Sequence, residues 1–463
     1  MERSDLTIYS PEIINQGITS FRRLKDELEY SDVEHLDLIA ALNARIFELE
    51  VLQEWKEPSF YLIHSIHAVS VWNNYEGLIE GVFSRQVIQA RVKDICAFFS
   101  EAKKILSAAE IPRLHLLNAI GELKALHKRT APVLKQYIPD EQYQLYNQEV
   151  QGYHDFLILQ LPKSLDLIRP WGKSILESYV HMKSGIRLDS ELFLSDLIVY
   201  LKELCSGQKK DETESAVTSK IEYQSELQII MELGQTLFPW KEDFDLKLES
   251  LDIREAVGIN EMRRFGYLFS NNLQLTKPKG ILLAHSQDMS LARIQLGLIH
   301  EWYPGHHYSR IIKTRRNYKE GILLENQIFE EGWAKYCEYF FAYHLVKTNE
   351  IKNEFNKGLM KSVLLAMAVV LIHAKRFDFK TAADFIHGVY EADVQTLHNI
   401  CIQAYFSPVE SLSYILGFFA VSHLLQIPVP GSSEKLLLTH NEQLRDLPYS
   451  CISQSLNAGR VHL

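Results

Sequence analysis

Hydrophobic residues recur along most of the chain at the spacing of an amphipathic α-helix. Segments 36–49, 85–106 and 120–137 all place apolar residues three or four positions apart. This spacing gathers the apolar side chains on one helix face, where they can pack against a core. Strand-like alternation is scarce, and residues 279–285, KGILLAH, form the best short candidate for a strand. The pattern therefore predicts a mainly α fold with few short strands.

One polar stretch interrupts this helical pattern near the middle of the chain. Residues 206–220 are rich in charged and small polar side chains and poor in large apolar ones. This stretch predicts a linker between an N-terminal helical region, 1–205, and a C-terminal helical region, 221–463. A long surface loop within one body fits the same composition.

Composition and charge narrow the class of protein. The chain has 463 residues, of which 46% are hydrophobic and 23% are charged, as in ordinary soluble globular proteins. Its formal net charge of −10 argues against a nucleic-acid partner, because proteins that bind nucleic acids usually present a basic face. Its five cysteines are scattered and form no C-x-x-C pair, which favours reduced thiols and a cytoplasmic location.

Neither a signal peptide nor a membrane span is expected. The first residues carry charge and lack an apolar core segment, unlike a signal peptide. Residues 362–374 are apolar but too short to cross a bilayer, and residues 411–433 include a histidine and two prolines. Both stretches are predicted to be helices of the protein core.

The first candidate chemistry lies in IHEWYPGHHYSR, residues 299–310. His300-Glu301 begins like the zinc-protease signature H-E-x-x-H, in which two histidines on one helix bind the metal. The glutamate of that signature takes a proton from water. Pro304 stands where the second histidine would be, and proline cannot bind a metal ion.

A bend after the His-Glu pair would restore a second ligand. Residues 290–299 predict a helix that leads into this pair. Pro304 disfavours helical geometry at the residue before it, and Gly305 permits the turn that follows. Either His306 or His307 can then reach the metal ion that His300 binds.

A second motif lies further along the chain. Residues 326–341 predict a helix that contains Glu331-Gly332-Trp333-Ala334. In zinc proteases of the gluzincin type, the third ligand is a glutamate on a following helix, often in the form E-G-F-A. Alone, Glu330 and Glu331 would be interpreted as an acidic helix start. Together with the first motif they predict a metal site of two histidines and one glutamate.

The chain resembles a bacterial family known as domain of unknown function 885, which is grouped with the gluzincin-like metallopeptidases. The resemblance covers the C-terminal third and rests on three motifs in order: HEWYPGHH at 300–307, EGWAKY at 331–336 and SPVESLSYILG at 407–417. It implies a large, mostly α-helical body that encloses one zinc ion. It also implies hydrolysis of peptide or other amide bonds.

The resemblance implies roles for individual residues of the two upstream motifs. His300 and Glu331 would bind the metal, and Glu301 would be the general base. His306 is the first choice for the second histidine ligand, because its G-H setting matches that of ligand histidines in related families. His307 is the second choice, and the sequence leaves this alternative open.

Two more residues are candidates for contacts with the substrate. Tyr414 in the third motif would donate a hydrogen bond to the oxyanion, as tyrosine or histidine does in related zinc peptidases. A buried core tyrosine on an apolar helix is the alternative. Arg310 lies closest to the histidines in a run of cations, and it would hold a substrate carboxylate. The alternative is that this run of cations lies on a solvated helix face, which is the commoner case for such runs.

These observations predict a zinc-dependent hydrolase that cleaves an amide bond in a peptide or small peptide-like molecule. The chain departs from the family at Ala404, where arginine is usual, and at Val409-Glu410, where Gly-Gln is usual. One alternative is therefore a metal-dependent tailoring enzyme that acts on a specialised metabolite, and another is a non-catalytic scaffold with a vestigial site. The same ligand set also accepts iron, manganese or cobalt.

Overall fold

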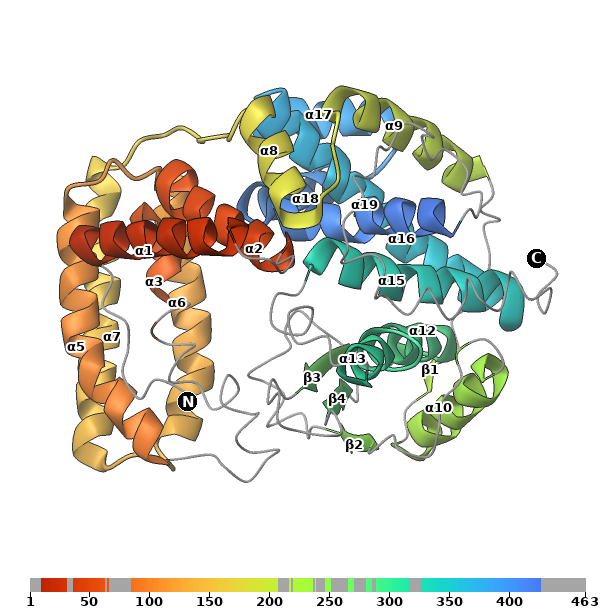
Figure 1. Cartoon of the computed structure of the whole chain (residues 1–463), viewed down its shortest axis with the longest axis horizontal. Helices are drawn as coiled ribbons and strands as arrows, with labels where there is room; N and C mark the ends of the chain where they lie inside the picture. The colour runs from red at the N-terminus through yellow and green to blue at the C-terminus, as the bar shows by residue number, and fades with distance from the viewer. Residues whose placement is uncertain are drawn as a thin grey trace. The chain divides into compact units, whose positions relative to one another are not determined.

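Helices dominate the protein, whose structure is a computed structural model (Figure 1). The chain divides into two compact units, unit 1 (Met1–His35, Leu42–Arg169 and Asp252–Arg264) and unit 2 (Leu36–Ala41, Pro170–Leu251 and Phe265–Leu463). The predicted mainly α fold with few short strands is confirmed. The structure describes residues 10–30, 36–62, 65, 85–206, 216–217, 220–235, 238, 246–250, 265–269, 280–284, 289–315 and 326–425.

This division differs from the predicted boundary at residue 205. Helices α8 (Lys173–Ser184) and α9 (Ser190–Ser206), expected in the N-terminal region, belong to unit 2. Tyr200 of α9 packs edge-to-face on Phe419, with ring centroids 5.1 Å apart. Helical periodicity shows which face of α9 is buried but not which helix covers it. Most of the predicted linker 206–220 lies outside the described residues.

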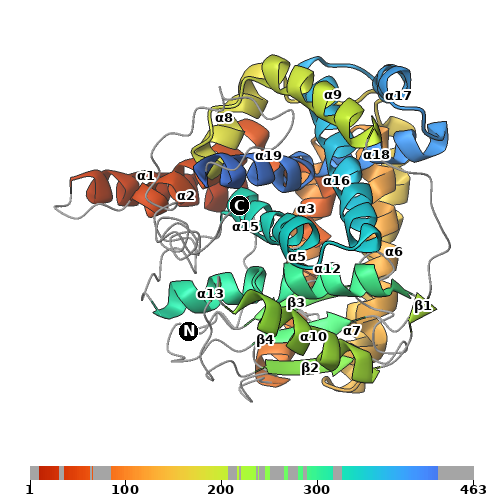
Figure 2. The same cartoon turned by 90° about the vertical axis from the view of Figure 1, so that its right-hand side faces the viewer.

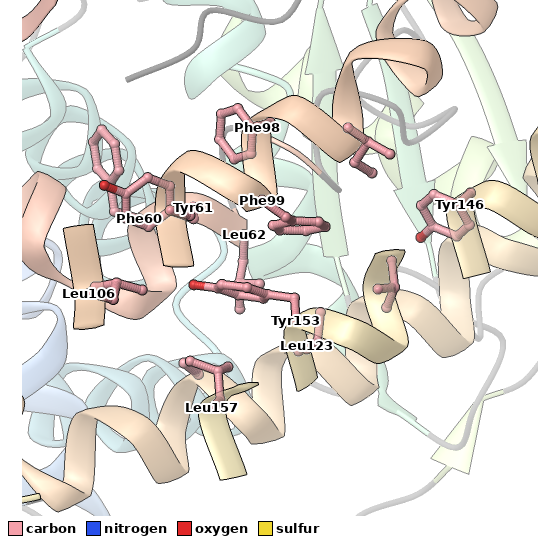
Figure 3. Close-up of a cluster of buried hydrophobic side chains, with 14 of the residues drawn as sticks. Phe60, Tyr61, Leu62, Phe98, Phe99, Leu106, Leu123, Tyr146, Tyr153 and Leu157 are labelled. Atoms are coloured by element: carbon pink, nitrogen blue, oxygen red, sulfur yellow. The ribbon is translucent and has the colours of Figure 1, made fainter. Parts of the chain in front are cut away.

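Unit 1 has a buried core of aliphatic and aromatic side chains (Figure 3). Helix α7 (Asp140–Gln160) packs on both α5 (Arg85–Ser107) and α6 (Arg113–Leu134). The rings of Phe99 and Tyr153 stack with centroids 4.5 Å apart. The other elements are α1 (Pro11–Glu29), α2 (Leu36–Phe47, which has residues in both units), a π-helical turn (Glu48–Leu52), α3 (Pro58–Leu62) and 3-10 turns at Glu54–Lys56 and Leu161–Lys163. Helices α2, α5 and α6 confirm the three helical segments predicted from periodicity.

Apolar helices pack together in the core of unit 2. Helix α16 (Asn349–Val369) continues into a π-helical turn (Val370–Ala374), and together they are long and apolar enough to cross a membrane. However, 83% of their most apolar window is buried within the protein. Helices α18 (Val394–Phe406) and α19 (Pro408–Leu424) pass the same test only as a pair, and they are bent by 98°. All of these segments pack against one another as core helices do.

Short strands occupy the sequence before the first motif. Strands β2 (Leu246–Ser250), β4 (Gly280–Ala284) and β3 (Phe265–Phe269) form a sheet in that order, with β2 parallel and β3 antiparallel to β4. Strand β4 lies within the segment predicted to be a strand. Strand β1 (Ala216–Val217) pairs with β5 (Met289–Ser290). The remaining elements of unit 2 are α10 (Lys220–Gly234), α12 (Leu291–Glu301), α13 (His306–Arg315), α15 (Gln327–Phe340), a π-helical turn (Phe341–Leu345) and α17 (Phe379–Val389).

Helices α15 and α19 lie side by side with their backbones in contact (Figure 2). A Cβ atom on Gly417 would lie 1.9 Å from the carbonyl oxygen of Ile328 and 2.8 Å from Cα of Gly332. A Cβ on Gly332 would lie 2.2 Å from the carbonyl carbon of Gly417. Only glycine fits at this crossing, because any side chain would push the two backbones apart. The glycines of the second and third motifs therefore hold these motifs together.

We expect Gly417→Ala to lower the free energy of unfolding by about 1–3 kcal/mol, as overpacking of a close-packed core does. Gly388→Ala is the matched control, because a Cβ on this glycine of α17 meets no atom within 4 Å. The control should be neutral or slightly stabilising, since alanine favours a helix over glycine. Urea unfolding of the three proteins measures both effects. If Gly417→Ala and Gly388→Ala were equally stable, the close backbone contact between α15 and α19 at Gly417 would be contradicted.

Candidate metal centre

Helix α12 places His300 and Glu301 at its C-terminal end. The side chain of Ser290 caps the helix by accepting a hydrogen bond from the backbone N–H of Arg293 at 3.3 Å. Most apolar residues of the helix are buried, Leu298 among them. The predicted helix is thus confirmed, and it ends where Pro304 predicts a boundary.

The Pro304-Gly305 bend connects the end of α12 to the start of α13. The backbone N–H of Gly305 donates a hydrogen bond to the carbonyl oxygen of Ile299 at 3.0 Å. A Cβ on Gly305 would lie 1.8 Å from the carbonyl oxygen of His300. Glycine is therefore required for this turn, and the turn brings His306, the first residue of α13, back to His300.

The second motif supports the same bend. Trp333 of α15 is fully buried, and its Nε1 donates a hydrogen bond to the carbonyl oxygen of Pro304 at 2.8 Å. The thiol of Cys337, one turn further along α15, also contacts this oxygen, at 3.7 Å. The helix that supplies Glu331 therefore also contacts the bend that precedes His306.

His300, His306 and Glu331 come together within unit 2. Their Nε2, Nε2 and Oε2 atoms lie within 4.8 Å of one another, and among the described residues they form the group of His, Cys, Asp or Glu able to hold a metal ion. The two Nε2 atoms are 3.2 Å apart. Glu331 Oε2 lies 3.2 Å from His300 Nε2 and 3.7 Å from His306 Nε2. Tetrahedral zinc, with bonds of about 2.0–2.1 Å, separates its ligand atoms by about 3.3–3.4 Å.

The chemistry of these atoms fits a cation. Oε2 of Glu331 is buried and accepts no hydrogen bond in the structure. A buried carboxylate oxygen that accepts no hydrogen bond is costly even beside two histidines, and a metal ion would remove that cost. Two imidazole nitrogens and one carboxylate oxygen are also a donor set that zinc favours.

The three candidate ligands shift one another's pKa values in the metal-free protein. Burial acts to lower the pKa of His300, but the carboxylates of Glu331 and Glu338 beside its two ring nitrogens outweigh it and raise this pKa to about 10. Burial similarly opposes a charge on His306, whose pKa the Glu331 carboxylate nevertheless raises. For Glu331, burial acts to raise the pKa, whereas the two histidines hold it well below the usual range.

Zinc binding at pH 7.5 should therefore release at least one proton per site. His300 keeps its proton in the metal-free protein at this pH, and coordination through Nε2 requires a neutral ring. Because protons and zinc compete, the zinc affinity should fall as the pH is lowered. Calorimetric titration in buffers of different ionisation enthalpy counts the protons. No proton release would contradict a protonated His300 in the metal-free protein.

The structure does not place His307 in this cluster. Its ring stacks on Trp302 with centroids 4.4 Å apart and is fully buried. Burial, followed by the charge of Arg310, lowers the pKa of His307 to about 3. Arg310 itself is only 4% exposed. The alternative interpretation, in which this run of cations lies on a solvated helix face, is therefore wrong for Arg310.

The two proposed catalytic residues flank the histidines. Glu301 is half-buried, and its charge is close enough to help raise the pKa values of His300 and His306. The ring of Tyr414 faces that of His300 with centroids 6.2 Å apart. Tyr414 is partly exposed, unlike the fully buried residues around it on α19.

Sequence reasoning missed two charged residues beside the cluster. Glu338 Oε1 lies 2.6 Å from His300 Nδ1, so it can accept the proton of the ring nitrogen that faces away from Glu331. Lys335 Nζ lies 2.8 Å from the same oxygen. Glu338 follows Glu331 by two helical turns, which places both carboxylates on one face of α15. This spacing was the available signal.

Comparisons with known proteins support the fold alone. No family model matches the chain, and no curated protein matches it. A candidate lipoprotein from Colwellia psychrerythraea has a similar structure, with a TM-score of 0.66 at 12% identity, covering 98% of this chain and 92% of its own. A candidate lipoprotein of unknown function from Shewanella oneidensis has a TM-score of 0.61 at 14% identity, covering 98% and 94%. These likenesses extend over nearly the whole chain and agree with its mainly α fold.

Proposed function

We propose that this protein is a zinc-dependent hydrolase of amide bonds in peptides or small peptide-like molecules. The observation that supports this most is the convergence of His300 Nε2, His306 Nε2 and Glu331 Oε2 at spacings close to those of tetrahedral zinc ligands. The three motifs that resemble those of the domain of unknown function 885 family support the same reaction class. The predicted cytoplasmic location stays a prediction.

The chain's own residues would divide the work as follows. His300, His306 and Glu331 hold the ion, which when bound supplies Lewis acidity toward water and the substrate carbonyl. Glu301 takes a proton from the attacking water and delivers it to the leaving amine, so that one carboxylate serves both halves of the reaction. Tyr414 donates a hydrogen bond from its phenolic O–H to the carbonyl oxygen as negative charge develops there.

Two features favour Glu301 as this base. It adjoins His300 in the sequence, and its charge acts on both histidines, so it lies beside the metal site. It is also absent from the cluster of three ligand atoms, which leaves its carboxylate available to a water molecule. A general base has to meet both conditions.

A substrate screen tests the proposal. Zinc-loaded protein would be incubated with a defined mixture of peptides and N-acyl dipeptides, and new amine termini would be detected by mass spectrometry. The proposal predicts cleavage that stops with a zinc chelator and returns when zinc is restored. Cleavage that survives chelation would contradict it. Zinc binding without cleavage in any such mixture would favour the scaffold alternative.

A further inference from the structure

A buried ion pair lies directly behind the metal centre. Lys335 and Glu338 of α15 are only 8% and 5% exposed. Lys335 Nζ contacts both carboxylate oxygens of Glu338, at 2.8 and 2.9 Å. Buried lysine and glutamate are rare because removing both charges from water costs more than most pairs regain. Such a pair therefore calls for a role besides folding stability.

The pair belongs to a closed ring of four side chains from three helices. Glu338 on α15 contacts Nδ1 of His300 on α12 at 2.6 Å. The ring of His300 faces that of Tyr414 on α19, with centroids 6.2 Å apart. Lys335 Nζ completes the ring at 5.9 Å from the centroid of Tyr414, a distance suited to a cation–π contact.

We propose that Lys335 and Glu338 are positioning residues of the metal centre, which together hold the His300 imidazole with Nε2 toward His306 and Glu331. An imidazole can rotate about its bond to Cβ, and a hydrogen bond at Nδ1 fixes both its rotation and its tautomer. Lys335 contacts both carboxylate oxygens of Glu338 and thereby fixes the carboxylate that accepts the hydrogen bond from His300. This inference rests on the zinc site of the proposed function and not on the reaction.

The pair's contribution to zinc binding can be separated from its contribution to folding. Lys335→Met alone leaves a buried carboxylate with a weaker partner, so this variant should melt at a lower temperature than the wild type. The double variant Lys335→Met/Glu338→Gln leaves no unpaired charge, and its melting temperature should return toward that of the wild type. Glutamine also keeps an oxygen that can accept from Nδ1, but without the charge that strengthens the bond.

Zinc affinity, measured by competition with a chromophoric chelator, decides the question. The double variant and Glu338→Gln alone should both bind zinc about 10–100-fold more weakly than the wild type. Their cobalt-loaded forms should also differ from the wild type in visible absorption, which reports ligand geometry. Glu354→Gln is the matched control, because Glu354 pairs with Arg293 and Lys357 and should leave the zinc affinity unchanged.

The outcomes separate this inference from the proposed function. Wild-type zinc affinity and an unchanged cobalt spectrum in the Glu338 variants would overturn the positioning role, even if the protein is a hydrolase. Weakened zinc binding in a protein that cleaves no amide would support the positioning role and contradict the proposed reaction. A wild type that binds no zinc would overturn both.

Discussion

Glu301→Gln is expected to keep its zinc and to lose about 10²–10⁴-fold in kcat/KM on any amide that the wild type cleaves. Glutamine has nearly the same shape as glutamate, but its amide cannot take a proton from water. The three ligand atoms belong to other residues, so the zinc content should stay at the wild-type level. Steady-state kinetics and elemental analysis on the same preparation measure both quantities.

Glu232→Gln is the control for this loss. Glu232 is exposed on α10, where it accepts a hydrogen bond from Gln228 at 2.7 Å, and its replacement should leave kcat/KM unchanged. If Glu301→Gln cleaves as fast as the wild type, another group is the general base. If the variant loses zinc as well as activity, the missing zinc is enough to explain the lost activity. Glu301 would then support the metal site without having to be the base.

Gly305→Ala should weaken zinc binding by more than the roughly 10–100-fold that loss of a hydrogen bond to a ligand typically causes. The added Cβ would lie 1.8 Å from the carbonyl oxygen of His300 and 2.4 Å from that of Ile299. These are backbone atoms, which cannot move aside as the end of a flexible side chain can. The turn would have to open, and His306 would then move away from His300.

The same chelator competition measures this effect, with Gly388→Ala as the control for a glycine that has open space around it. Circular dichroism should show that Gly305→Ala keeps most of its helix content, because the turn contributes few helical residues. Zinc binding by Gly305→Ala at wild-type strength would show that His306 does not depend on this turn.

Helices with a strong apolar stripe could be predicted from the sequence, and so could the end of α12. Pro304 and Gly305 have local backbone rules that are visible in the sequence, and the bend follows from those rules. The division into units could not be predicted in the same way. Which helix covers the buried face of α9 depends on contacts with Phe419, far along the chain.

The candidate site was predictable to the extent that its residues lie in motifs. His300 and Glu331 belong to two spaced motifs, whereas the choice between His306 and His307 required the actual turn. The two histidines are adjacent, so the exact position of the turn decides that His306 faces Glu331 and that His307 stacks on Trp302. Glu338 was missed because a lone glutamate on a helix is usually solvated, and only its contact with His300 shows otherwise.

The choice of His306 over His307 gives the most direct test of the metal centre. Zinc content per chain would be measured by elemental mass spectrometry on the wild type, His306→Ala and His307→Ala, each purified without chelator or added metal. We expect about one zinc per chain in the wild type and in His307→Ala, and almost none in His306→Ala. Zinc that is lost from His307→Ala but retained in His306→Ala would contradict the site described here, as would a wild type that holds none when zinc is supplied.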